Sequence, residues 1–263
     1  MNTESFVEGE GVWTGLGAPA TVDWCEPNYV HSVYVAEWYN SLSSLPIAAL
    51  GAVALVWSFR TPWRRTGRFA WASAVLLIVG LGSTAFHASL LRVGQALDEL
   101  PMVYAGLSYL YVLLARRHEP TDPRLGRLRI GLLLFGLAFT VAYLFVTAWF
   151  WFFVAAYAGL VALLVLRTGW ISWRSSPMHR RWFGWSAGAY VGGVCFLWVP
   201  EHVLLPCDHP AQGAMLHAWF HLTSAIGSYA WLMWAANDRF MEDPARRPLS
   251  TWWPPASASN ADV

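Results

Sequence analysis

Long apolar runs separated by short polar connections dominate the pattern of this chain. Seven runs approach the length of about 20 residues that a helix needs to cross a bilayer. They lie at residues 37–58, 68–90, 97–115, 127–146, 149–167, 182–200 and 213–235. The pattern predicts an all-α integral membrane protein with seven transmembrane helices.

The same pattern divides the chain into three parts. Residues 1–36 form an N-terminal segment outside the membrane, residues 37–235 form the seven-helix domain, and residues 236–263 form a tail. The first 21 residues lack the basic start and the apolar middle of a cleavable signal peptide. The tail ends in a stretch rich in Pro, Ala and Ser, which predicts disorder at its end.

Composition supports a membrane location. Only 13% of the residues are charged, whereas soluble domains carry roughly 25%. The net charge of +1 gives no reason to expect a nucleic-acid partner. All 17 basic residues are arginine. The lack of lysine suggests a GC-rich genome, and hence a bacterial cytoplasmic membrane as the location.

The arginines indicate how the helices are oriented. All except Arg92 fall in the first, third and fifth connections and in the C-terminal tail. They are Arg60, Arg64, Arg65, Arg68, Arg116, Arg117, Arg124, Arg127, Arg129, Arg167, Arg174, Arg180, Arg181, Arg239, Arg246 and Arg247. Because basic residues favour the cytoplasmic side, the N-terminus is expected outside and the C-terminus in the cytoplasm. An even number of spans would put the two tails on the same side and spoil this sorting.

This orientation brings polar residues to one depth near the outer leaflet. Ser83 and His87 lie near the outer end of the second span, and Asp98 and Glu99 lie at the outer mouth of the third. Ionisable residues inside a membrane cost about 2.5–3.5 kcal/mol each even on the lenient insertion scale. They are therefore candidates for function.

The seventh span adds two histidines at the same depth. His217 and His221 are four residues apart, so both point from one face of the helix. Together with His87 they form a set of three histidines, which is a known catalytic zinc arrangement with an open fourth position. Zinc lowers the pKa of a bound water to about 7 and so activates it for attack.

Two further residues are candidates for catalysis. Asp98 could carry the proton of the activated water, and Ser83 could hold that water or stabilise a developing oxyanion. Glu99, on the neighbouring face, is expected to cap or orient the third helix. A haem or proton-relay protein could also use the two histidines of the seventh span, but it would leave His87 and Asp98 without a shared purpose.

A second cluster of polar residues precedes the first span. Asp23, Glu26, Asn28 and Glu37 offer hard oxygen ligands, and the carbonyl of Trp24 could complete a shell. Calcium takes six to eight such oxygens. The spacing is not that of an EF-hand, so the residues alone favour a solvated acidic loop over a calcium site.

Two of the three cysteines fall on the outer side. Cys25 lies in the N-terminal loop and Cys207 in the sixth connection, whereas Cys195 lies within a span. An oxidising compartment would permit a Cys25–Cys207 disulfide. Two free thiols are the alternative.

Taken together, these motifs resemble the alkaline ceramidase family, within a superfamily of seven-span hydrolases that also includes adiponectin-receptor-like proteins. The stretches that carry the resemblance lie in order between Asp23 and Tyr229. They are DWCEPN with a Glu fourteen residues after its Asp, GLGSTAFHASL, QALDELPM and HAWFH.

The resemblance implies a function for each cluster. It implies zinc on His87, His217 and His221, with Ser83 and Asp98 beside the metal. It also implies calcium on Asp23, Trp24, Glu26, Asn28 and Glu37, and so reverses the preference for a solvated loop. The implied activity is hydrolysis of ceramide, or of a related N-acyl lipid, to a sphingoid base and a fatty acid.

A receptor or lipid sensor like the adiponectin receptors is the alternative. The expected position of the N-terminus outside the membrane disfavours this alternative, because the receptor branch has the opposite orientation. The DWCEPN loop also disfavours it. A membrane lipid is the expected partner in either case, and the sequence gives no oligomeric state.

Overall fold

The computed structural model describes residues 9–60, 67–118, 121–145 and 149–242, and this part of the chain is helical without a β-sheet. Seven long helices follow one another along the chain. They are α1 (Trp38–Arg60), α2 (Arg68–Ser89), α3 (Arg92–Leu114), α4 (Pro123–Phe145), α5 (Trp149–Trp173), α6 (Pro177–Gly193) and α7 (Leu216–Glu242). Two short π-helices, η2 (Val194–Trp198) and η3 (Pro200–Leu204), continue α6, and the 3-10 helix η4 (Pro210–Ala214) precedes α7.

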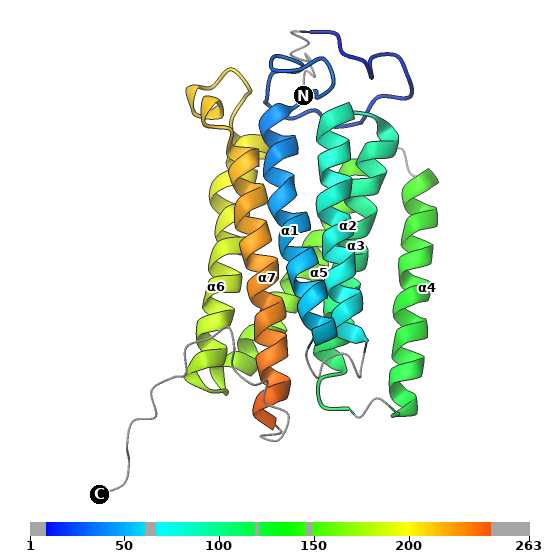
Figure 1. Ribbon diagram of the computed structural model, residues 1–263, viewed down its shortest axis with the longest axis vertical. Coiled ribbons are helices and arrows are strands. Elements are labelled where there is room, and N and C mark those ends of the chain that lie inside the picture. Colours follow the sequence, from blue (N-terminus) through cyan, green and yellow to red (C-terminus); the bar gives the residue numbers. More distant parts are fainter. Residues whose placement is uncertain (1–8, 61–66, 119–120, 146–148, 243–263) are drawn as a thin grey trace, which may run out of the picture.

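The long helices run side by side as an upright bundle (Figure 1). The first helix packs against α2 and α7, α3 packs against α2, and α4 lies at one edge beside α3. The N-terminal segment and the connection between η3 and α7 lie at the same end of the bundle. This end therefore gathers the loops that hold the candidate site.

Five helices of the described part are long and apolar enough to cross a membrane: α1, α2, α4, α5 from Phe150, and α6 together with its π-helical extension to Leu204. The helices α3 and α7 are also long enough, with 23 and 27 residues. Their sequences carry polar residues such as Asp98, Glu99, His217 and His221, which lower their hydropathy. The prediction of an all-α membrane protein thus agrees with the structure.

Several predicted boundaries were wrong. The fifth helix ends at Trp173, six residues late, and the sixth begins at Pro177, five residues early. The third helix begins at Arg92, five residues earlier than predicted, so Asp98 and Glu99 lie inside it rather than at its mouth. The sixth continues to Leu204 through π-helical turns, and α7 ends at Glu242, seven residues late. Polar groups at the start of α3 and in η3 find partners within the protein, such as Gln95 with Glu99 and the Glu201 carbonyl with Gln212, so these helices extend beyond the apolar pattern. Residues 243–263 of the predicted tail lie outside the described residues.

Glycines allow the first three helices to touch. A side chain at Gly51 would meet the backbone of Leu77 in α2, and one at Gly80 would meet the backbone of Ala48 in α1. At Gly82 an added Cβ would overlap the carbonyl oxygen of Leu97 in α3. Small residues at helix crossings allow this close approach in membrane bundles. As a result, α2 and α3 are fixed against each other beside Ser83 and Asp98.

Candidate metal centre

Three buried histidines meet near the end of the bundle that carries the N-terminal segment. His87 from α2 is 0% exposed, and His217 and His221 from the first turns of α7 are 4% and 5% exposed. Their ligand atoms all lie within 4.8 Å of one another. Such a group could hold a metal ion. Among the described residues, no other three His, Cys, Asp or Glu side chains have their ligand atoms this close together.

Each histidine is oriented through its Nδ1 atom. His87 Nδ1 is hydrogen-bonded to Glu37 Oε2, and His221 Nδ1 lies 2.9 Å from Ser43 Oγ. His217 Nδ1 lies 3.3 Å from Glu201 Oε2, which is within ion-pair distance but lacks hydrogen-bond geometry. These contacts leave Nε2 to face the centre of the group, and His87 Nε2 is buried with no partner within the described chain. Partners of this kind fix the tautomer of metal-ligating histidines, so the residues fit a bound metal.

The sequence analysis missed Glu201 and Ser43. Glu201 lies in η3, just beyond the predicted sixth span, and is only 4% exposed. The signal that could have found it is an acidic residue next to an apolar run, in the stretch LWVPEH. Ser43 gave no such signal, because a serine in an apolar helix is common.

An indole ring covers one side of the histidine group. Trp24 stacks on His217 with 3.6 Å between ring centroids and 24° between planes. His202 lies in η3 with its ring 4.8 Å from that of Trp24. The π-helical turns bring Glu201 to His217 and His202 to Trp24. Such turns are frequent at functional sites.

The two predicted catalytic residues lie beside the histidines. Ser83 Oγ is 2.9 Å from Ser44 Oγ, and the Ser83 hydroxyl also interacts with Asp98. The carboxyl group of Asp98 lies close enough to His87 to interact with it electrostatically. The structure thus brings Ser83, Asp98 and the three histidines together, as the sequence predicts.

These groups lie at one end of a large cavity. It has a volume of about 530 Å³, and its wall includes Ser83, Asp98, His217 and His221. The remaining wall comes mainly from apolar side chains of α3, α5, α6 and α7. Along α5 the cavity extends from Phe150 to Leu166, which is about 24 Å of helix rise. The shape suits a long hydrocarbon chain whose polar end lies at the histidines.

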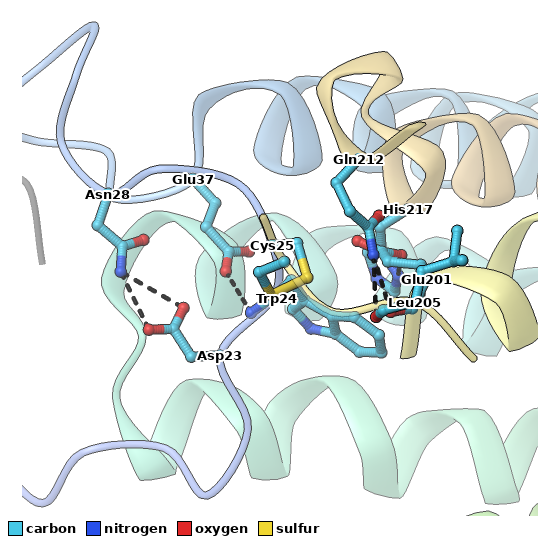
Figure 2. Close-up of a disulfide and its surroundings, with 10 residues drawn as sticks. Asp23, Trp24, Cys25, Asn28, Glu37, Glu201, Leu205, Gln212 and His217 are labelled. Carbon is cyan, nitrogen blue, oxygen red and sulfur yellow. Dashed lines mark hydrogen bonds and ion pairs between the residues drawn. A yellow bond between two sulfur atoms is a disulfide. The ribbon is translucent and has the colours of Figure 1, made fainter. Parts of the chain in front are cut away.

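The predicted calcium residues also lie close together, outside the histidine group. The amide of Asn28 donates to Asp23 at 3.1 and 3.4 Å, and Glu37 accepts from the backbone N–H of Trp24 at 3.0 Å (Figure 2). Glu26 accepts from the backbone N–H groups of residues 39 and 40 and so caps α1.

The electrostatics of this loop fit a cation. Partial loss of hydration, followed by the negative charge of Glu37, raises the pKa of Asp23 to about 7, although part of the side chain stays exposed to solvent. Burial likewise raises the pKa of Glu26. Asn28 Oδ1 is buried without a donor among the described residues. Glu26, Asn28 and Glu37 are buried, whereas Asp23 is exposed to solvent. Neighbouring carboxylates with an unpaired amide oxygen beside them would be stabilised by a bound cation.

Glu37 belongs to both clusters. Its Oε1 accepts from the N-terminal loop through Trp24, and its Oε2 is bonded to His87. A change in the loop can therefore reach the histidine group through one carboxylate.

A disulfide between Cys25 and Cys207 joins the N-terminal loop to the connection before α7. In Figure 2 it lies between the Asp23–Asn28–Glu37 group and the Glu201–His217 group. The two cysteines are 182 residues apart along the chain. Because Cys25 is the neighbour of Trp24, the disulfide helps to keep Trp24 stacked on His217.

We expect loss of this disulfide to destabilise the protein. Cys25→Ser should lower the free energy of unfolding by about 2–5 kcal/mol, because the unfolded chain loses a long-range constraint. Thermal unfolding in detergent would show a lower midpoint. Cys195→Ser is the matched control, since Cys195 is free and exposed. Equal midpoints for the two variants would contradict the expectation.

Comparison with known proteins identifies the family of the chain. The chain is 30% identical over 244 residues to alkaline ceramidase 3 of Mus musculus, covering 89% of this chain and 88% of the relative. It is 24% identical over 245 residues to the alkaline ceramidase of Drosophila melanogaster, covering 89% and 82%. It is 41% identical over 96 residues to alkaline ceramidase YPC1 of Saccharomyces cerevisiae, covering 36% and 29%. The Ceramidase family model matches residues 18–260, so the chain belongs to the ceramidase family.

Proposed function

We propose that this protein is a zinc-dependent lipid amidase that hydrolyses the amide bond of ceramide, or of a related N-acyl lipid, to a sphingoid base and a fatty acid. The observation that carries the proposal is the position of the three histidines at the polar end of an apolar cavity. Relatives of similar length are named alkaline ceramidases. Neutral imidazoles with a vacant position favour zinc over other divalent metals.

The residues around the histidines supply the rest of the chemistry. A bound zinc ion would act as a Lewis acid toward the amide carbonyl and toward water. Asp98 accepts a proton from the attacking water and returns it to the leaving nitrogen. The Ser83 hydroxyl donates to the oxygen that gains negative charge. Glu37, Glu201 and Ser43 keep the three imidazoles in the tautomer that points Nε2 inward.

We also propose that all seven helices cross the membrane, with the N-terminal segment outside. The arginine distribution supports this orientation. The site would then lie near the outer leaflet, and the cavity would extend from it into the membrane.

Incubation with a panel of N-acyl lipids, followed by mass spectrometry of the released fatty acid, tests the proposed function. We expect release from ceramide or from another member of the panel. His217→Ala is the inactive control. If no lipid in the panel is cleaved, the alternative of a receptor or lipid sensor gains support.

The N-terminal loop would bind calcium through Asp23, Glu26, Asn28, Glu37 and the carbonyl of Trp24. The buried carboxylates of Glu26 and Glu37 and the unpaired oxygen of Asn28 support this assignment. Because Glu37 also holds His87, calcium would stabilise the zinc ligand as well as the loop.

We expect calcium to raise thermal stability. At a concentration 100 times its Kd, a ligand that binds only the folded state adds about 2.7 kcal/mol. A chelator selective for calcium should lower the unfolding midpoint, and Asn28→Ala should remove this response. Asp208→Asn is the control, because Asp208 lies exposed in the connection before α7. A chelator response that persists in Asn28→Ala would count against the site.

A further inference from the structure

A second buried carboxylate lies directly beside the proposed proton carrier. Glu99 follows Asp98 in α3 and is only 3% exposed. Nothing in the proposed chemistry uses it. Its partners form a network that we call the Glu99 network: Thr21, Arg92, Gln95, Glu99 and Tyr143.

The hydrogen bonds of this network reach two other parts of the protein. Tyr143 of α4 donates to Glu99 Oε2 at 2.6 Å, and Gln95 Nε2 donates to Glu99 Oε1 at 2.7 Å. Gln95 Oε1 in turn accepts from the backbone N–H of Thr21 at 2.8 Å. Glu99 is therefore held from α4 on one side and, through Gln95, from the N-terminal segment on the other.

Arg92 brings a positive charge to this network. Its Nη1 donates to Gln95 Oε1 at 2.7 Å, and its guanidinium lies 5.0 Å from the ring centroid of Tyr143. A buried carboxylate needs both donors and a nearby positive charge. This accounts for the one arginine that departs from the sorting of the other 16.

The network is arranged so that it controls the rotation of α3. Successive residues of a helix point about 100° apart, so fixing the direction of Glu99 also fixes that of Asp98. On the other side of α3, Gly82 allows contact with the backbone at Leu97 and Asp98. The outer turns of α3 are thus held from two directions.

We propose that Glu99 is a positioning residue that keeps the Asp98 carboxyl directed into the cavity. This inference rests on the proposed function, because it assigns Asp98 a role in turnover. An experiment can distinguish this role from a purely structural one, because a second hydrogen bond joins α3 and α4 away from Asp98. That bond runs between Tyr104 and Thr140 at 2.9 Å.

The pair of bonds offers a matched experiment. Tyr143→Phe removes the donor to Glu99, and Tyr104→Phe removes the bond that does not reach the site. For Tyr143→Phe we expect kcat to fall roughly 10- to 100-fold, because small misplacements of a reacting group have effects of this size. Its KM and its zinc content should stay close to those of the wild type. Tyr104→Phe should leave kcat unchanged.

Substitutions at Glu99 provide the second arm. Glu99→Gln keeps an oxygen that can accept from Tyr143, so its kcat should lie between those of the wild type and Glu99→Ala. All variants are compared for thermal stability and zinc content, so that loss of fold is separated from loss of positioning. If Glu99→Ala folds poorly, the kcat of the conservative variant Tyr143→Phe decides whether the positioning role holds.

The outcomes separate this inference from the proposed function. If the wild type cleaves an N-acyl lipid but Tyr143→Phe matches Tyr104→Phe in kcat, only the positioning role is overturned. An equal fall in both tyrosine variants would show that the bonds merely hold α4, and would also overturn it. If the wild type cleaves no lipid, the proposed function fails and the positioning role fails with it.

Discussion

Replacing His217 by alanine should remove both the zinc and the activity of the protein. The wild type is expected to bind about one zinc per chain, held by three buried imidazoles. With two ligands left, the site no longer has the three protein ligands typical of catalytic zinc. Metal analysis of the purified variant should show loss of zinc, and hydrolysis should fall to the background rate.

Two comparisons sharpen this experiment. Glu201→Gln alters only the partner of His217 and should weaken zinc binding by about 10- to 100-fold. His118→Ala is the control, because His118 pairs with Asp122 outside the histidine group. Full ceramide hydrolysis by His217→Ala would rule out the proposed metal mechanism.

Asp98→Asn should separate metal binding from turnover. Asp98 is not one of the three histidine ligands, so the variant should keep its zinc. It can no longer accept the proton of the attacking water, and general-base contributions are typically 10²–10⁴-fold. We therefore expect kcat to fall by about that factor while the thermal midpoint stays near that of the wild type.

The control for Asp98 is another aspartate. Asp122→Asn changes an aspartate in the connection before α4, where its carboxylate bonds to His118 and to the backbone of Arg124. This variant should keep full turnover. If Asp98→Asn is also fully active, Asp98 does not carry the proton.

Much of the site could be predicted because its polar residues stand out against an apolar background. A histidine or an aspartate is costly inside a membrane, so the sequence positions of His87, Asp98, His217 and His221 were informative by themselves. The helical period then placed His217 and His221 on one face, and the arginine distribution placed the spans at a common depth. The structure brings these residues together, although their roles remain proposals.

The residues that support the site were harder to predict. Ser43 contacts His221 across 178 residues of sequence, and no local pattern encodes such a contact. Glu201 depends on π-helical turns that continue α6 beyond its apolar pattern. Glu99 was expected to cap or orient the third helix; it lies inside α3, so it does not cap it, and its hydrogen bond to Tyr143 of another helix had no signal in the sequence. These contacts are set by tertiary packing, which a single sequence does not specify.

The contact at Gly82 has a consequence for attempts to redesign this protein. Pro101 has no N–H, so the Leu97 carbonyl lacks its usual donor in α3, and Gly82 packs against that carbonyl. Any side chain at position 82 would push the two helices apart and separate Ser83 from Asp98. Variants made to accept different lipids should therefore keep this crossing unchanged. The apolar side chains of α5 and α6 offer safer positions, because they line the cavity without setting the distance between the reacting groups.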